Sequence, residues 1–477
     1  MNLKEAQSVH IVGIGGIGVS AVAKFLFQEG KRVSGSDLVG GESAEECKEL
    51  GMFVMAGHHA ENIPPECDLV IYSDAVPEDN PERRAAEARG IPQMSYAEAL
   101  GELSRRKRTI AVSGTNGKST TTAMLGLVLE AAGFDPTVIV GSKVKSFRFG
   151  NLRVGSGDWL VVEGDEHRAH MLHLHPEMIV LTNVEEDHLD YYRDLAHIKD
   201  TFDEYIQKLS LEGALVWNAD DSACEDLAER VSMTRTVSYG METAGDYMAR
   251  NIAVRDGRQE FDLLWTVPHE ETLGRISLQI PGRFNVANAL AAASAALALG
   301  IPFETVAKTL AGFSGIWRRF ERVGERDGAV IISDYAHHPT SVRGTIAAAR
   351  EFYPERRIVA VFQPHQRNRT KKLFEDFVRA FAGADAVVIS EIYEVPGREE
   401  AEDRDISSRD LVAAIQKEGH KYPEGHKYPE GHKPEEVIYG GGLEETKSLV
   451  RELLAPNTLV LIMGAGDVYT IARELLV

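Results

Sequence analysis

Two glycines, a lysine and three hydroxyl side chains stand together in one short stretch, GTNGKST, at residues 114–120. Gly114 and Gly117 let the backbone turn tightly, so that its N–H groups can face the oxygens of a phosphate. The apolar-periodic run that follows predicts a helix, whose N-terminus adds partial positive charge at the same place. Lys118 adds a full positive charge. The spacing therefore predicts a site for the phosphates of a nucleotide.

Hydroxyl, carboxylate and imidazole groups near this stretch predict a metal site. Ser119 or Thr120 can offer a hydroxyl oxygen to Mg²⁺. Glu163 stands at the end of one buried strand, and His188 lies just beyond another. Because ligands bind at the carboxyl ends of strands in such sheets, we expect Glu163 and His188 to complete the site. Alternatively, the four acids around His188 favour a helix N-terminus through its dipole.

A second glycine-rich turn lies near the N-terminus. Residues 10–37 have the pattern of a strand, a turn, a helix and a second strand that ends in Asp37. Gly13, Gly15 and Gly18 fit the spacing G-x-G-x-x-G, and Asp37 stands where such folds place a carboxylate near a ribose. The fingerprint is compatible with an NAD enzyme, with another binder of a nucleotide diphosphate, or with close packing of a strand on a helix.

Two loops in the last third of the chain carry histidines and arginines directly after apolar strands. The first holds Asp334 and His338, and the second holds Arg367 and Arg369. Both loops would emerge at carboxyl ends of strands, where ligands bind. Upstream, Asn288 is a candidate for an adenine contact at the start of an alanine-rich helix.

Composition narrows the class of protein. The chain has 477 residues, which is more than one hydrophobic core usually serves, so two to four domains are expected. The net charge of −21 disfavours binding to nucleic acid or to anionic membranes. No apolar run is long enough to insert in a membrane, and the N-terminus lacks the pattern of a signal peptide, which predicts a cytoplasmic protein.

The alternation of apolar strands with amphipathic helices predicts an α/β fold. A basic stretch that ends at Arg108 and a change of pattern near residue 315 indicate domain boundaries, giving domains 1–108, 109–315 and 316–477. Within the last domain, residues 418–434 repeat EGHKYP. Proline, glycine and charge cannot build a core, so we expect an exposed linker; its three histidines could alternatively bind metal weakly.

The order and spacing of these motifs resemble those of the Mur ligase superfamily over nearly the whole chain. The motifs are GIGGIGVS and SGSD in the first domain, GTNGKSTTT, NVEEDHLDYY and GRFNVANALAA in the second, and RRFE, DYAHHPT and FQPH..RT in the third.

The resemblance implies three α/β domains. They are an N-terminal Rossmann-like domain that binds a UDP sugar, a central phosphate-loop ATPase with a parallel sheet, and a C-terminal Rossmann-like domain that closes over both. It further implies ATP- and Mg²⁺-dependent amide formation through an acyl phosphate, with UDP-N-acetylmuramate and L-alanine as substrates, in peptidoglycan precursor synthesis. The alternatives are a related ligase for another amino acid or a recycled peptide, a nucleotide-dependent dehydrogenase, and a non-catalytic nucleotide-binding protein.

The resemblance also assigns roles to individual residues. Implied ATP contacts are Gly114, Thr115, Asn116, Gly117, Lys118, Ser119, Thr120, Asn288, Arg319 and Asp334. Implied metal ligands are Ser119, Thr120, Glu163 and His188. Implied contacts to the UDP sugar are Gly15, Gly16, Ile17, Ser36 and Asp37, and to the amino acid His338, Arg367 and Arg369. The implied catalytic set is Lys118, Glu163, His188, His338 and Arg369.

The sequence departs from the family pattern at a few of these places. The family often has histidine where Asn116 and Phe284 stand, and usually has arginine where Gln366 stands. Arg367 would then compensate from the next position. Some relatives use a carbamylated lysine at a second metal; Lys199 is the lysine near that part of this sequence.

Overall fold

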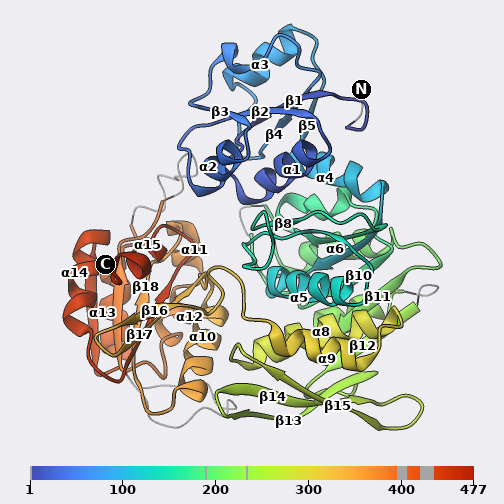
Figure 1. Cartoon of the computed structure of the whole chain (residues 1–477). Coiled ribbons are helices and arrows are strands. Elements are labelled where there is room, and N and C mark those ends of the chain that lie inside the picture. The colour runs from blue at the N-terminus through green and yellow to red at the C-terminus, as the bar shows by residue number, and fades with distance from the viewer. Residues whose placement is uncertain (1–2, 189–190, 232–234, 395–404, 419–433) are drawn as a thin grey trace. The chain divides into compact units, whose positions relative to one another are not determined.

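A computed structural model describes residues 3–188, 191–231, 235–394, 405–418 and 434–477 (Figure 1). The predicted linker therefore lies almost entirely outside the described residues. The chain forms two compact units that interleave in sequence. The first unit comprises residues 1–250, 262–274 and 287–310, and the second comprises residues 251–261, 275–286 and 311–477.

The first sheet of the first unit is wholly parallel, with the strand order β3-β2-β1-β4-β5. Strand β1 is buried along its whole length, as expected for the central strand of a parallel sheet. The strands are β1 (Ser8–Val12), β2 (Arg32–Asp37), β3 (Phe53–Ala56), β4 (Leu69–Tyr72) and β5 (Gln93–Ser95). The helices are α1 (Ile17–Gln28), α2 (Glu42–Glu49), η1 (Ala60–Asn62), α3 (Pro81–Ala88) and α4 (Tyr96–Arg105).

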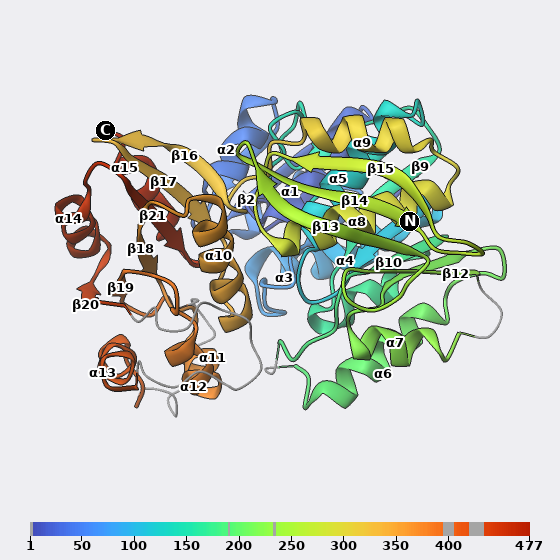
Figure 2. The ribbon, with the colours of Figure 1, turned by 90° about the horizontal axis from the view of Figure 1, so that it is seen from below.

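The second sheet has the order β15-β14-β13-β12-β11-β10-β6-β9-β7-β8 among the described residues. Its strands from β6 to β12 pair in parallel, whereas β7 and β8 are antiparallel. The strands are β6 (Arg108–Ser113), β7 (Thr137–Ile139), β8 (Leu152–Arg153), β9 (Trp159–Gly164), β10 (Met178–Leu181), β11 (Ala214–Asn218), β12 (Arg235–Gly240), β13 (Tyr247–Arg255), β14 (Arg258–Trp265) and β15 (Glu271–Leu278). The last three run side by side in both views (Figures 1 and 2).

The elements that accompany this sheet include the helix predicted after the phosphate loop. They are α5 (Lys118–Ala131), η2 (His167–His173), α6 (Leu195–Ile206), α7 (Ser222–Ala228), α8 (Arg283–Ala298) and α9 (Phe303–Gly312). Helix α5 is buried over most of its length, which explains why its sequence is apolar and small almost all round.

A buried lysine joins the first sheet's helices to the next part of the same unit. Lys24 of α1 is 1% exposed, and its ammonium donates to Glu46 Oε2 (2.6 Å), Asn151 Oδ1 (2.9 Å) and the carbonyl of Phe149 (3.1 Å). Because three acceptors satisfy the buried ammonium, its burial costs little free energy of folding. Lys143 also pairs with Glu46, at 2.6 Å.

The third sheet lies in the second unit and has the order β16-β17-β21-β18-β19-β20. Alternate residues of its strands face two separate apolar cores, so helices cover both faces. The strands are β16 (Glu321–Arg326), β17 (Ala329–Asp334), β18 (Arg357–Phe362), β19 (Ala386–Ser390), β20 (Glu436–Gly441) and β21 (Thr458–Met463). The helices are α10 (Pro339–Phe352), α11 (Arg367–Lys372), α12 (Phe374–Arg379), α13 (Ser408–Glu418), α14 (Leu443–Leu453) and α15 (Tyr469–Glu474).

The α/β fold with three largely parallel sheets is confirmed. The strand pairs β7–β8 and β16–β17 are antiparallel. Within the described part of the chain, every helix is too short or too polar to span a bilayer.

Candidate active site

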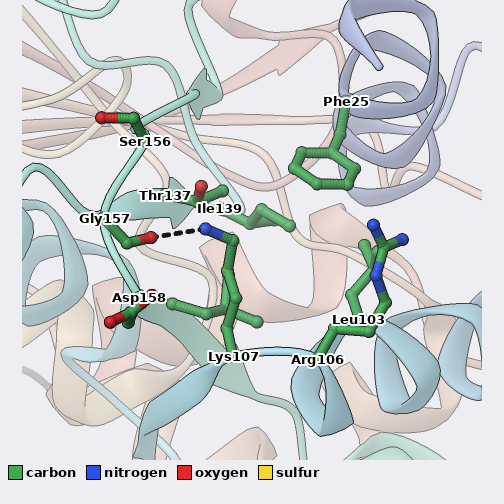
Figure 3. A pocket seen from close by; sticks show the side chains of 10 residues that line it. Phe25, Leu103, Arg106, Lys107, Thr137, Ile139, Ser156, Gly157 and Asp158 are labelled. Atoms are coloured by element: carbon green, nitrogen blue, oxygen red, sulfur yellow. Dashed lines mark hydrogen bonds between the residues drawn. The ribbon is translucent and has the colours of Figure 1, made fainter. Parts of the chain in front are cut away.

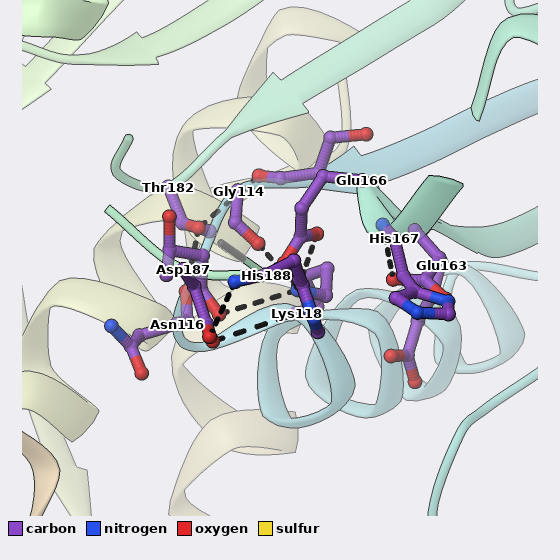
Figure 4. Close-up of polar contacts among 12 residues, drawn as sticks. Gly114, Asn116, Lys118, Glu163, Glu166, His167, Thr182, Asp187 and His188 are labelled. Atoms are coloured by element: carbon purple, nitrogen blue, oxygen red, sulfur yellow. Dashed lines mark hydrogen bonds and ion pairs between the residues drawn. The ribbon is translucent and has the colours of Figure 1, made fainter. Parts of the chain in front are cut away.

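The predicted phosphate loop connects β6 to α5 and requires glycine at two places (Figure 4). Gly114 has φ of 131° and Gly117 has φ of 89°, a region that favours glycine. A Cβ on Gly117 would collide with the side-chain oxygen of Asn288, and one on Gly114 would collide with the hydroxyl of Thr182. The loop therefore packs tightly against Thr182 and Asn288, and α5 begins directly after Gly117.

Residues that follow β10 hold the loop in place. The N–H of Thr115 donates to the carbonyl of Asn183 (2.9 Å), and that of Asn116 donates to its side-chain oxygen (2.8 Å). The hydroxyl of Thr182 donates to the carbonyl of Asn116 (2.6 Å), and the N–H of Glu185 donates to the hydroxyl of Thr115 (2.9 Å). These bonds fix the loop's shape before any ligand arrives, which lowers the entropic cost of binding.

The ammonium of Lys118 turns back over the loop toward Glu166 (Figure 4). Its Nζ lies 2.7 Å from Glu166 Oε2 and 2.6 Å from the carbonyl of Gly114. Burial lowers the pKa of Lys118, but the carboxylates of Glu166, Asp165 and Glu163 more than offset this, so its pKa is raised above the ordinary value. Lys118 therefore carries a full charge at the loop at any physiological pH.

Glu163, at the end of β9, contacts the loop through its serine. The hydroxyl of Ser119 donates to Glu163 Oε2 at 3.0 Å, and the N–H of Gly141 donates to the other carboxylate oxygen. Thr120 is buried beside them in the same helix turn. The structure therefore brings together Ser119 and Glu163 of the predicted metal set.

His188 lies near a carboxylate that the sequence reasoning did not include. Its Nε2 is 3.6 Å from Glu166 Oε1, and Glu166 is almost fully buried. Burial lowers the pKa of His188, but the carboxylates of Glu166, Asp187 and Asp165 raise it by more, so the net pKa lies above its ordinary value. Ligand atoms of Asp165, Glu166 and His188 lie within 4.8 Å of one another, a spacing that suits one metal ion.

Glu166 thus links the two predicted residues Lys118 and His188. The signal that could have found it is its place in WLVVEGDE, one residue beyond the acids that end β9. Asn288 also lies at the loop, where its Oδ1 is 3.4 Å from the hydroxyl of Thr121. Lys199 is engaged elsewhere, because its ammonium donates to Asp226.

The glycine turn after β1 is closed by Asp37. Its Oδ2 accepts from the N–H of Gly15 at 2.9 Å, while its Oδ1 accepts from the N–H groups of Val39 and Gly40 at 3.1 and 3.0 Å. A Cβ on Gly15 would collide with the same carboxylate. The predicted pair Gly15 and Asp37 is therefore together, with the carboxylate bound to the turn itself.

Other predicted residues of this turn have structural partners. Gly16 is the N-cap of α1, and the carbonyl of Ile17 accepts from the side chain of Asn151. The hydroxyl of Ser36 donates to Glu82 Oε2 at 2.6 Å and lies 3.0 Å from His58 Nδ1.

Glu82 is the centre of a buried polar network below this turn. It has no exposed surface and also contacts His10 Nε2 (3.1 Å), the side chain of Asn62 (2.6 Å) and the N–H of His59 (3.1 Å). Burial raises the pKa of Glu82, but hydrogen bonds from His10, Ser36 and Asn62 lower it by more, so the net pKa lies below its ordinary value.

In the second unit, a series of rings connects two of the predicted arginines. The guanidinium of Arg319 lies 4.9 Å from the ring centre of Tyr335, which is 5.2 Å from His337. His337 is 6.2 Å from His365, whose Nδ1 is 3.3 Å from Arg369 Nη1. The loops after β17 and β18 therefore meet at the carboxyl ends of two parallel strands, which are separated in the sheet by β21.

The remaining predicted residues of this unit have defined partners. Asp334 accepts from the N–H groups of Phe320 (2.6 Å) and Ala336 (2.7 Å), and burial raises its pKa although nearby Arg319 acts in the opposite direction. His338 is the N-cap of α10. Arg367 is held by Glu394 and by the carbonyl of Ile406.

A small cavity of about 140 Å³ lies elsewhere in the first unit (Figure 3). Phe25 and Arg106 line one side of it and Lys107 another, where the ammonium donates to the carbonyl of Gly157 at 2.6 Å. Ligand pockets are about 300–1,000 Å³, so this cavity is too small for a nucleotide.

Comparison with known proteins assigns the three sheets to known domains. Residues 8–108 match the model described as Mur ligase family, catalytic domain; residues 112–296 match the Mur ligase middle domain; and residues 318–466 match the Mur ligase, glutamate ligase domain.

Relatives of the same length are also known. The UDP-N-acetylmuramate--L-alanine ligase of Geobacter sp. (strain M21) is 39% identical over 98% of this chain and 97% of its own. The protein of that name from Syntrophotalea carbinolica is 40% identical over 98% of this chain and 97% of its own. The crystal structure of a UDP-N-acetylmuramate-alanine ligase from Thermotoga maritima superposes with a TM-score of 0.82 at 28% identity, covering 98% of each chain. With its phosphate loop, its three sheets and this full-length similarity, the chain belongs to the Mur ligase family.

Proposed function

We propose that the protein joins L-alanine to UDP-N-acetylmuramate in the cytoplasm, with ATP, as a step of peptidoglycan precursor synthesis. The observation that carries this is the identity of 39–40% over nearly the full length of relatives named for that activity. In the reaction, the substrate carboxylate attacks the γ-phosphate of ATP to give an acyl phosphate and ADP. The amine of alanine then displaces phosphate and forms the amide.

The phosphate loop supports the nucleotide part of this proposal. Gly114 and Gly117 supply the positive φ angles that the tight turn requires, and the N-terminus of α5 begins there. Lys118 carries the charge that stabilises the transferring phosphoryl group, since phosphoryl transfer is catalysed mainly by positioning and charge. Asn288, which closes the loop beside Gly117, is proposed to meet the adenine, and Arg319 and Asp334 are proposed nucleotide contacts of the second unit.

The donor set near the loop fits Mg²⁺. Ser119 and Glu163 supply hydroxyl and carboxylate oxygens 3.0 Å apart, and oxygen is the ligand that Mg²⁺ prefers. Thr120 and His188 are the other proposed ligands. When bound, Mg²⁺ polarises phosphoryl oxygens and offsets their charge. Glu166 is proposed to orient the side chains of Lys118 and His188, because its carboxylate contacts both.

The two substrates are assigned to different glycine turns and loops. We propose that the turn from Gly15 to Ile17, with Ser36 and Asp37, binds the diphosphate of the UDP sugar, because its N–H groups lie at the start of α1. His338, Arg367 and Arg369 are proposed to hold alanine. A guanidinium matches a carboxylate in geometry, and Arg369 of α11 contacts His365 in the loop that follows β18.

The test is phosphate release from ATP with UDP-N-acetylmuramate and each of the twenty amino acids, with the product identified by mass. We expect release with L-alanine and only 10- to 200-fold less with glycine or serine, since one methyl or hydroxyl group is worth about 1–3 kcal/mol. Reactions without the UDP sugar are the control. Phosphate release with a tripeptide or another amino acid, but not with alanine, would refute alanine as the substrate and leave the proposed ligase activity standing.

A further inference from the structure

A second set of metal-binding side chains lies beside the phosphate loop. Asp165 follows β9, and His167 and His170 belong to η2. One ligand atom from each of the three lies within 4.8 Å of the other two. The proposed ligase reaction uses neither histidine.

The backbone between the two histidines has an unusual shape. Arg168 and Ala169 both have left-handed dihedral angles, with φ of 48° and 57°. Residues other than glycine rarely adopt this region, and such residues cluster at functional sites. The turn brings the ring centres of His167 and His170 to 5.6 Å, with the two rings nearly perpendicular. Both rings then have a nitrogen close to the Asp165 carboxylate.

His170 is arranged as a metal-binding histidine with a carboxylate behind it. Its Nδ1 is 3.7 Å from Asp165 Oδ2, and its Nε2 is 3.2 Å from Asp74 Oδ2. Both ring nitrogens are enclosed, and neither makes a hydrogen bond of good geometry among the described residues. A histidine that binds a metal through one nitrogen typically has its other nitrogen oriented by a carboxylate, which is the position of Asp74.

We propose that Asp165, His167 and His170 bind one Zn²⁺ ion, with Asp74 as the outer carboxylate. Two imidazoles among three ligands form a donor set for zinc, whereas a Mg²⁺ site is built mainly of oxygen ligands. Three protein ligands leave the fourth position of a tetrahedral zinc ion to water. Because Asp74 follows β4 and the ligands follow β9, the ion ties the first sheet of this unit to the second.

The experiment titrates Zn²⁺ into the full-length, metal-free protein in competition with a chromophoric chelator. His420, His426 and His432 of the EGHKYP repeat are replaced by glutamine throughout, so that the repeat cannot contribute. We expect one Zn²⁺ per chain, unchanged by excess Mg²⁺.

Single substitutions locate the ion. His167→Gln and His170→Gln should each weaken binding by more than about 100-fold, and Asp74→Asn by about 10- to 100-fold, the usual effect of an outer partner. His173→Gln is the matched control, because His173 lies in the same segment with its side chain exposed. Its affinity should equal that of the parent.

Two results would overturn the proposal. One is equal Zn²⁺ affinity in the parent and in His170→Gln. The other is binding that survives His170→Gln but is lost in His188→Gln, which would place the ion in the neighbouring cluster with Glu166. X-ray absorption of the zinc-loaded parent removes any dependence on the folding of variants: two imidazole ligands are expected, and their absence would also refute the site.

Discussion

Glu166 is the buried carboxylate that pairs with the cationic side chains at the phosphate loop. It is almost fully buried and contacts the ammonium of Lys118 at 2.7 Å and the imidazole of His188 at 3.6 Å. A buried carboxylate of this kind is tolerable only while its cations remain, since an unpaired buried charge is costly. Lys118 therefore has a structural role in addition to its proposed role at the phosphates.

The substitution Lys118→Ala is expected to lower both turnover and stability. Turnover should fall at least about 100-fold, because a charge that stabilises the transition state is lost. The melting temperature of the ligand-free protein should also fall, because breaking a buried pair costs about 3–5 kcal/mol. Steady-state kinetics and calorimetry measure the two effects.

The double variant Lys118→Ala, Glu166→Gln separates these effects. Removing the orphaned charge should restore much of the melting temperature and none of the turnover. Near-normal turnover in Lys118→Ala would show that the loop does not hold the transferring phosphate.

At this scale the sequence located the loop but not all of its partners. The spacing of Gly114, Gly117 and Lys118 is a local signal, because one turn and one helix end create the site. The contacts of Glu166 are not local, since they join residues 48 and 22 positions apart in the chain. Residue type alone did not distinguish it from the acids next to it.

Helix α11 carries both arginines proposed for the amino acid, but it holds them differently. Arg369 contacts the imidazole of His365 at 3.3 Å, whereas Arg367 is held by the Glu394 carboxylate and the carbonyl of Ile406. Arg369→Ala should raise KM for alanine about 10- to 100-fold, because a bond to a charged group is worth about 1.5–3 kcal/mol. KM for ATP should stay nearly unchanged.

Arg367→Ala is the comparison within the same helix. Its effect on KM for alanine should be smaller, and because it leaves Glu394 without its cation, it should lower the melting temperature more than Arg369→Ala does. A larger change in KM for alanine in Arg367→Ala than in Arg369→Ala would reverse the two roles.

Helix α3 presents Glu82 to a buried network, and this makes the first sheet sensitive to acid. The folded pKa of Glu82 is lowered, so its contribution to stability is present above the unfolded value of about 4.3 and is lost as pH falls through the folded pKa. Glu82→Gln should flatten the dependence of the free energy of unfolding on pH below about 5. Urea unfolding from pH 3.5 to 7 measures this.

Glu87→Gln is the control for this prediction, because Glu87 is an exposed carboxylate of the same helix. It should retain the acid dependence of the parent. An identical dependence in Glu82→Gln would mean that the network does not govern acid unfolding.

At the scale of elements, local signals predicted most of the strands and helices around the motifs. Asn80 and Pro81 are residue types that favour the start of a helix, and α3 begins there, where the side chain of Asn80 accepts from two backbone N–H groups. The turn at Arg168 and Ala169 could not be predicted, because neither residue type favours a left-handed backbone. It is imposed by the surrounding packing, and so is the meeting of His167 with His170.

For the whole molecule, the predicted linker can be tested without reference to its conformation. Replacing residues 422–431 by a short Gly-Ser segment should change kcat, KM and melting temperature little, since each doubling of loop length costs only about 0.6 kcal/mol. A scrambled segment of the same composition serves as the control. A marked loss of activity with the Gly-Ser segment would show that the repeat has a specific role.

The buried ammonium of Lys24 has a consequence for how the first unit opens. Its three acceptors belong to α2 and to the segment around β8, so neither neighbour can separate without exposing an unpaired charge or carbonyl. Partial opening there is thereby penalised, and the two sheets should open as one cooperative foldon. Backbone amides of β1 and β6 are then expected to exchange hydrogen with the same free energy of opening and the same denaturant dependence.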